Sequence, residues 1–171
     1  MSEVIRSRDC TVFYKAASTT VAVSSAMVSG GRAGGQGVQW VGVVGDDRVV
    51  TYSEGIYGGF LIWGSDELGD DFTAITRQQP TYRYATMLFG DCLIATSSYE
   101  KYTYASRVGG SPVPLVYQPN DILMLSRRGL WTKEDELTIV GSPLAPAPVA
   151  GYVAQTPKEV NRYYLGIQVA M

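Results

Sequence analysis

Short runs in which apolar and aromatic residues occupy every second position dominate this sequence, and they constrain its fold more than any other feature. Residues 38–44, 57–63 and 163–170 show the alternation clearly, whereas helical periodicity is nearly absent. Stretches rich in glycine, proline, asparagine and aspartate separate the runs. About ten short strands at this spacing predict an all-β protein, a small β-barrel or β-sandwich. We expect mostly antiparallel pairing, because no helix is long enough for a parallel crossover.

At most one or two single helical turns are expected. Thr156, Pro157 and Glu159 mark one, with a threonine N-cap, a proline at the first helical position and a glutamate that closes a capping box. Residues 1–15 show little periodicity and are predicted to form an extended arm that orders on contact with a neighbour. Residues 16–171 are predicted to form a single domain, which is large enough to fold without a metal or a disulfide.

Charge and composition argue against several classes of function. Fourteen basic and sixteen acidic residues give a net charge of −2, and the basic residues are scattered, whereas a nucleic-acid-binding protein normally shows a basic face. No run approaches the ~18 apolar residues of a membrane span, and no signal-peptide core is visible. We therefore expect no nucleic-acid partner, no membrane partner, and synthesis in a cytoplasm.

No motif of known chemistry is complete. The chain has no histidine, so Cys10 and Cys92 lack partners for a zinc site and are expected to stay reduced. The glycine-rich stretch 29–37 lacks the lysine of a P-loop and leads into a strand, which favours a loop. The acidic residues of 66–71 could serve a hydrolase or hold calcium loosely, but a solvated turn is the favoured interpretation. We predict no catalytic residue, no metal and no cofactor, and hence no enzyme.

Aromatic and basic side chains are instead candidates for a protein interface. The run 98–107 predicts a strand with an aromatic exposed face. Residues 117–135 predict a turn, a strand over Ile122–Ser126, a wet hairpin tip at Arg127–Gly129 and a return strand. Trp131 on that return strand either covers the barrel end or meets a partner. The candidate interface residues are Arg6, Arg8, Tyr99, Tyr102, Tyr104, Arg127, Arg128, Trp131, Pro143 and Pro146.

The C-terminal third resembles the capsid cement and head-decoration proteins of tailed bacteriophages. The shared pattern is a tyrosine, an Asn-Asp turn, a Ser-x-x-Gly-Leu-x-Thr hairpin, a Gly-x-Val strand, a proline-led turn and a closing Leu-Gly-Ile strand. Asn120 stands where the family usually has a glycine, and the proline-rich segment 141–148 lengthens one loop. The matching positions are Tyr117, Asp121, Leu123, Ser126, Gly129, Leu130, Thr132, Gly151, Val153, Pro157, Leu165, Gly166 and Ile167.

This resemblance implies a non-enzymatic protein of the virion, located on the capsid surface, that stabilises the capsid. Such a protein would bind neighbouring subunits of the major capsid protein as a homo-oligomer, with a trimer favoured. Two structural alternatives are a tail or baseplate component and a head–tail connector. A carbohydrate-binding module that uses the tyrosine and tryptophan face is an alternative of another class.

Overall fold

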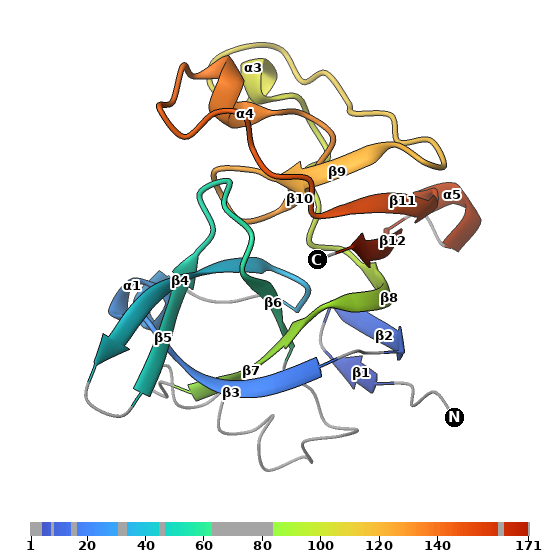
Figure 1. Cartoon of the computed structure of the whole chain (residues 1–171). Coiled ribbons are helices and arrows are strands. Elements are labelled where there is room, and N and C mark those ends of the chain that lie inside the picture. The colour runs from blue at the N-terminus through green and yellow to red at the C-terminus, as the bar shows by residue number, and fades with distance from the viewer. Residues whose placement is uncertain are drawn as a thin grey trace.

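The molecule combines a closed barrel with an open sheet (Figure 1). The barrel contains β3, β5, β4, β6 and β7, and the seven-stranded sheet has the order β1-β2-β8-β12-β11-β9-β10. The prediction of an all-β fold is confirmed, and every strand pair in the described residues is antiparallel except β3 with β5. The structure is a computed structural model that describes residues 5–7, 9–14, 17–30, 34–44, 47–62, 84–160 and 163–170. The strands are β1 (Ile5–Ser7), β2 (Cys10–Tyr14), β3 (Ala17–Val23), β4 (Gly37–Val44), β5 (Asp47–Tyr52), β6 (Gly59–Ile62), β7 (Tyr84–Phe89), β8 (Asp91–Thr96), β9 (Ile122–Leu125), β10 (Trp131–Thr132), β11 (Gly151–Gln155) and β12 (Leu165–Ala170).

Short helices are more numerous than expected. In α5 the Glu159 carboxylate accepts a hydrogen bond from the Thr156 amide at 2.7 Å, as the capping box predicts. Helix α3 differs from the prediction, because its residues lie in the run 98–107, for which the sequence predicts a strand. None of the helices in the described part of the chain has the length and apolar character needed to cross a membrane. The helices are α1 (Ser25–Gly30), α3 (Tyr104–Arg107), α4 (Glu136–Ile139) and α5 (Pro157–Val160).

A local hydrogen bond explains why the run 98–107 is not a strand. The Thr103 side chain accepts from the Ser106 amide at 3.2 Å and so caps α3. Threonine and serine compete in this way with strand pairing. Tyr99 and Tyr102 therefore form only isolated bridges, to Trp131 and Pro114.

Part of the expected N-terminal arm lies within the seven-stranded sheet. Strand β2 pairs with β8 from Cys10 onward, and the side chains of Cys10 and Val12 are fully buried. The intervening Thr11 is only partly buried, so the short run does alternate, and its buried face belongs to the domain. Residues 1–4, 8 and 15 of the expected arm lie outside the described residues.

Strands β6 and β7 belong to the cores of both layers. Phe60 and Leu88 pack in the cluster beneath the seven-stranded sheet, whereas Leu61 and Met87 pack in the barrel cluster. Side chains alternate between the two faces of a strand, so a strand buried on both faces reads as a continuous apolar run. The sequence Gly-Phe-Leu-Ile of β6 has this character, and all four residues are buried.

Candidate functional site: an uncharged crown on an ionic base

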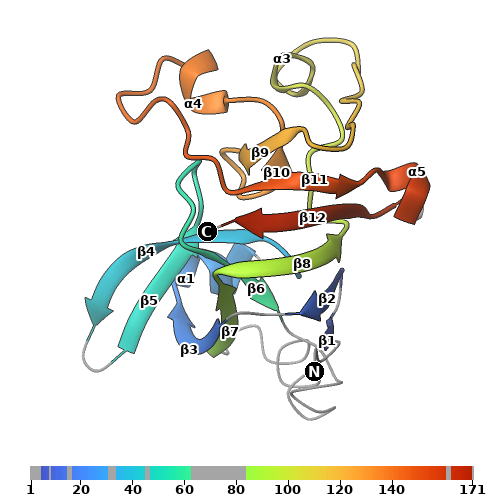
Figure 2. The ribbon, with the colours of Figure 1, turned by 45° about the vertical axis from the view of Figure 1, so that its right-hand side comes forward.

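Two long connections form a separate layer above the sheet, which we call the crown (Figures 1 and 2). The crown consists of residues 101–121, between β8 and β9, and residues 133–150, between β10 and β11. Residues 108–120 and 137–150 contain no charged side chain, and together they hold six of the eight prolines of the chain. Prolines restrict the backbone, which limits the conformations open to both connections.

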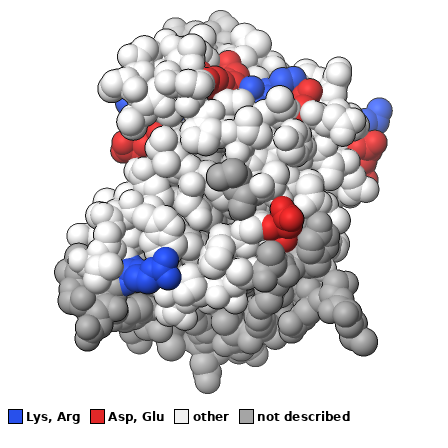
Figure 3. All heavy atoms as spheres, in the orientation of Figure 1, with Lys and Arg blue, Asp and Glu red and all other residues white. Residues whose placement is uncertain are grey.

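The crown presents large apolar side chains to solvent. Val108, Val113 and Val116 in one connection, and Ile139 and Leu144 in the other, are each more than half exposed. Figure 3 shows the upper end of the molecule as mainly uncharged, with charged side chains gathered lower, near the base of the crown. Depletion of charge around exposed aliphatic side chains is typical of the central part of a protein interface.

Two fully buried carboxylates lie at the base of the crown. Glu100 precedes α3 and Glu136 begins α4, and neither is accessible to solvent. Arg107 of α3 bridges them, because its Nη1 lies 3.0 Å from Oε2 of Glu100 while its Nη2 contacts Oε1 of Glu136. The Arg107–Glu136 contact therefore links α3 in the first connection to α4 in the second.

A second arginine reaches the same cluster from the β9–β10 hairpin. Arg128 donates from Nε to Oε2 of Glu100 at 3.1 Å and from Nη2 to Oε1, a two-pronged contact that suits a carboxylate. This hydrogen bond raises the pKa of Arg128. Glu100, Glu136, Arg107 and Arg128 thus form what we call the ionic base, and their charges sum to zero.

The first connection depends on polar contacts, because α3 buries none of its own residues. Glu134 accepts from the Tyr104 amide at 2.8 Å, and the Tyr117 hydroxyl donates to the Glu100 carbonyl at 2.6 Å. Burial raises the pKa of Tyr117, which keeps its hydroxyl a neutral donor. The ionic base and these bonds therefore position an exposed apolar surface that has little core of its own.

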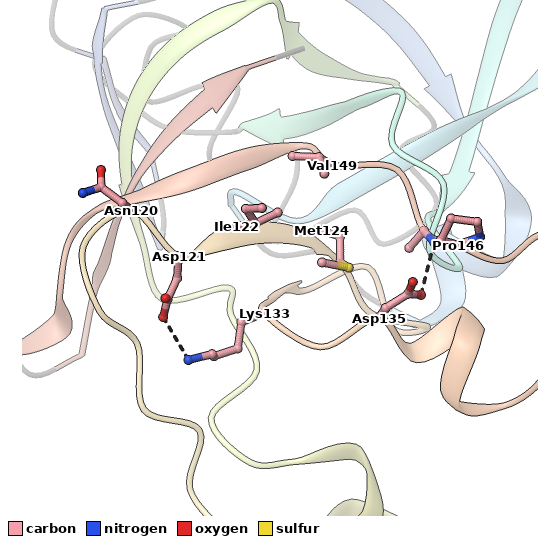
Figure 4. Close-up of a pocket in the computed structure, with 9 residues that line it drawn as sticks. Asn120, Asp121, Ile122, Met124, Lys133, Asp135, Pro146 and Val149 are labelled. Atoms are coloured by element: carbon pink, nitrogen blue, oxygen red, sulfur yellow. Dashed lines mark hydrogen bonds and ion pairs between the residues drawn. The ribbon is translucent and has the colours of Figure 1, made fainter.

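A shallow groove of about 640 Å³ is lined by residues of β9 and of both connections of the crown (Figure 4). Met124 and Ala147 are buried and form an apolar floor, and the side chain of Ile122 is about half exposed. On the rim, the Lys133 ammonium lies 2.9 Å from a carboxylate oxygen of Asp121. The hydrogen bond from Lys133 holds the pKa of Asp121 below its ordinary value.

Asp135 also lines this groove and ties α4 to the proline-rich segment. Its carboxylate accepts from the Thr138 amide and from the Ala147 amide, both at 3.1 Å. Burial alone would raise the pKa of Asp135, but these hydrogen bonds outweigh burial and lower it. The groove is thus bordered by carboxylates already engaged within the chain.

The predicted hairpin over residues 117–135 is present. Asn120 has φ 71°, as expected for an asparagine in the place of a turn glycine. Gly129 at the tip has φ 77°, and a Cβ there would lie 2.8 Å from the Gly37 carbonyl oxygen. The tip therefore packs closely against the start of β4, which requires glycine.

Two predicted interface residues belong to the core instead. Trp131 is fully buried, and its indole Nε1 donates to the Gly35 carbonyl at 2.8 Å. Tyr99 is 6% exposed and meets the Tyr117 ring edge-on, with centroids 5.6 Å apart. Burying large aromatic rings such as these contributes strongly to stability. The prediction that these two side chains contact a partner is therefore wrong.

The remaining candidates are distributed unevenly. The crown brings together Tyr102, Pro143 and Pro146, all exposed. Tyr104 is partly buried beneath the Arg107 guanidinium. Arg127 is exposed at the hairpin tip, whereas Arg128 belongs to the ionic base. Arg6 pairs through its backbone in β1. Arg8 and the acidic residues of 66–71 lie outside the described residues.

Sequence reasoning missed Glu100, Arg107 and Glu136. The available signal was only that each is a charged residue next to an apolar or aromatic neighbour. Arg107 pairs with Glu136, 29 residues further along the chain, and no local pattern encodes this contact.

The two cysteine thiols, which lie outside the crown, are inaccessible to solvent. Cys10 and Cys92 are both fully buried free thiols, and burial raises the pKa of Cys10. A thiol with a raised pKa is a poor nucleophile and a poor metal ligand. Within the described ranges no cluster of three or more histidine, cysteine, aspartate or glutamate side chains could hold a metal ion.

No protein-family model matches the chain, and no significant match was found among curated proteins or solved structures.

Proposed function

We propose that this protein is a non-enzymatic structural component of a bacteriophage virion. It decorates the capsid surface and stabilises the capsid by binding neighbouring subunits of the major capsid protein through the crown. The observation that carries this proposal is the outer part of the crown, residues 108–120 and 137–150, which is uncharged, proline-rich and exposes apolar side chains above an ionic base with two buried carboxylates.

The physical properties of the crown favour protein binding over other roles. Its exposed valine, leucine and isoleucine side chains gain from removal from water, and no charged group in residues 108–120 or 137–150 needs desolvation. A surface held in one conformation loses less entropy on association than a mobile one. On a symmetric shell, many weak contacts of this kind add up to strong retention.

The geometry of the β9–β10 hairpin and of the turn before it supports a role on the capsid. The resemblance to capsid cement proteins depends on the turn at Asn120 and the tight tip at Gly129, and both adopt the left-handed backbone that the pattern requires. This agreement between backbone and pattern supports the resemblance at these two positions.

Addition of the protein to undecorated capsids tests the proposal. We expect saturable, stoichiometric binding and a higher temperature of capsid disruption. Val116→Asp with Leu144→Asp places charge in both connections of the crown, and should weaken binding at least about ten-fold. Tyr163→Asp changes an exposed side chain outside the crown, 56% exposed, and should bind as the unmodified protein does.

Three results would count against the proposal. Absence of capsid binding would contradict the capsid role. Equal binding by the crown variant and the Tyr163 variant would show that the crown is not the binding surface. Association with purified tails or connectors, and not with empty heads that lack tails, would move the role to a tail, baseplate or head–tail connector component.

A further inference from the structure

Strand β4 has one edge that is largely without a partner strand in the described residues. On one side β4 pairs with β5 from Val38 to Val44. On the other side it pairs with β6 only at Gly37 and Val38. Figures 1 and 2 both show the β4–β5 pair extending away from β6 and from the crown. Gly58 lies against Gln39 and Trp40, so it is over residues 41–44 that the edge facing away from β5 has no partner strand among the described residues.

An open strand edge specifies the kind of occupant. Its amide and carbonyl groups need hydrogen-bond partners at the spacing of an extended backbone, which another β-strand supplies. Proteins usually protect such an edge with a charged side chain, with a proline or with a bulge that twists the edge away. Residues 37–44 contain no charged residue and no proline.

The side chains along this edge are apolar and unusually exposed. Val41 is 60% exposed and Val43 is 67% exposed, and they flank Gly42. A Cβ added at Gly42 would meet no atom within 4 Å, so the space beside this position is open. The strand carries a bulge between Trp40 and Gly42 in its ladder with β5, which brings Val41 out of the regular pairing.

We propose that β4 pairs edge to edge with β4 of a second copy of this chain, antiparallel and two-fold symmetric about Gly42. In this register Val41 of each copy lies opposite Val43 of the other, so exposed valines meet valines and no like charges face each other across the new pair. Glycine against glycine at the centre leaves the two backbones free to approach.

The symmetry of this pairing has a direct consequence for assembly. An antiparallel edge pair uses the same surface twice and closes with two copies. The dimer therefore replaces the trimer expected from the resemblance to capsid cement proteins. The pairing lies away from the crown, so it does not depend on the proposed capsid role, and the crown of each copy stays available.

The mass of the full chain in solution at micromolar concentration is the first test. We expect the mass of two chains, falling about two-fold in Val43→Lys because a charge then lies in the pairing edge. Val108→Lys is the matched control, since Val108 is 64% exposed but lies in the crown, and it should remain dimeric. A monomeric or trimeric unmodified protein, or a dimer in Val43→Lys, would overturn the proposal.

Cysteine cross-linking tests the register independently. A mixture of Val41→Cys chains and Val43→Cys chains should form a disulfide-linked dimer on mild oxidation, whereas either variant alone should cross-link far less. The native cysteines are buried and do not interfere. If the mixture gave no more cross-link than the single variants, the two-fold register about Gly42 would be wrong. Neither test uses capsids, so its result is independent of the proposed capsid function.

Discussion

Gly129 and Gly141 both have a positive φ, 77° and 70°, yet their surroundings differ. A Cβ at Gly129 would lie 2.8 Å from the Gly37 carbonyl oxygen, whereas a Cβ at Gly141 would meet no atom within 4 Å. We predict that Gly141→Ala lowers the free energy of unfolding by roughly 1–2 kcal/mol, the backbone strain alone. Gly129→Ala should lower it clearly more, because backbone must also move. Urea denaturation of both variants measures the difference, and equal effects would contradict the close packing of the hairpin tip.

Individual residues show where sequence reasoning succeeds. Asn120 and Gly129 were predictable because left-handed turn positions restrict the residue type strongly. The burial of Tyr99 and Trp131 was not predictable, since an aromatic residue in a short run fits either face of a strand. Only the long-range approach of the Gly35 carbonyl gives Trp131 its buried partner.

At the level of elements, the ionic base holds α3 in place. We predict that Arg107→Met lowers the free energy of unfolding by about 3–5 kcal/mol, because Glu136 then stays buried without its arginine. Hydrogen exchange of residues 101–117 should increase in the same variant, since α3 buries none of its own residues. Denaturation and exchange mass spectrometry measure the two effects.

A second substitution separates charge from packing at the same site. Arg107→Met combined with Glu136→Gln removes both charges of the broken pair, so no buried carboxylate is left uncompensated. The double variant should be more stable than Arg107→Met alone. If it were less stable, loss of packing around the guanidinium, and not the buried charge, would dominate.

Glu136 also makes stability depend on pH. Burial raises its pKa from the ordinary 4.5, although the Arg107 hydrogen bond and charge oppose this and Glu100 adds to it. The folded protein therefore holds the proton more tightly than the unfolded chain. The Glu136 contribution to stability is complete below pH 4.5 and is lost as the pH rises through the folded pKa. Unfolding measured across this range should show a decline that Glu136→Gln lacks.

Asp121 acts in the opposite direction and must be separated from Glu136. Its pKa is lowered from 3.8 by the Lys133 hydrogen bond, so its contribution is present above that pH and is lost as the pH falls. The comparison of Glu136→Gln with the unmodified protein cancels this shared effect. A pH profile that Glu136→Gln leaves unchanged would contradict the raised pKa of Glu136.

Elements with complete local signals were predictable, and those with tertiary causes were not. Helix α5 follows from a capping box and an N-terminal proline within four residues. Helix α3 was missed because the tyrosines of the run 98–107 favour a strand, while the Thr103 cap and the Arg107 contacts decide the outcome. The proline-rich segment was recognised as a surface, but its relation to residues 108–120 emerged only from the fold.

At the scale of the whole molecule, side chains of the barrel strands β6 and β7 pack into both the barrel cluster and the cluster beneath the sheet. We predict a single cooperative unfolding transition, seen alike by far-UV circular dichroism and by tryptophan fluorescence. Leu61→Ala in the barrel cluster and Ile62→Ala in the sheet cluster should each lower the free energy of unfolding by about 2–5 kcal/mol. Each should shift the entire transition. Separate transitions for the two probes would contradict a single domain.

Alternation predicted the fold class but not the arrangement of the strands. Period-two patterns identify which residues share a face, whereas pairing order depends on contacts far apart in sequence. Strand β2, for example, pairs with β8 more than eighty residues later. The division into a barrel and a sheet thus could not be read from local periodicity.

The exposed glycines of the crown have a practical consequence. A Cβ at Gly109 or at Gly141 would meet no atom within 4 Å, and both positions lie at outward bends of the chain. Exposed bends with few contacts tolerate inserted sequence best. A foreign peptide spliced in after Gly109 would leave the barrel and the sheet intact while standing in the path of any partner of the crown. The molecule would then fold normally and display the inserted peptide, but it would no longer bind a partner through the crown.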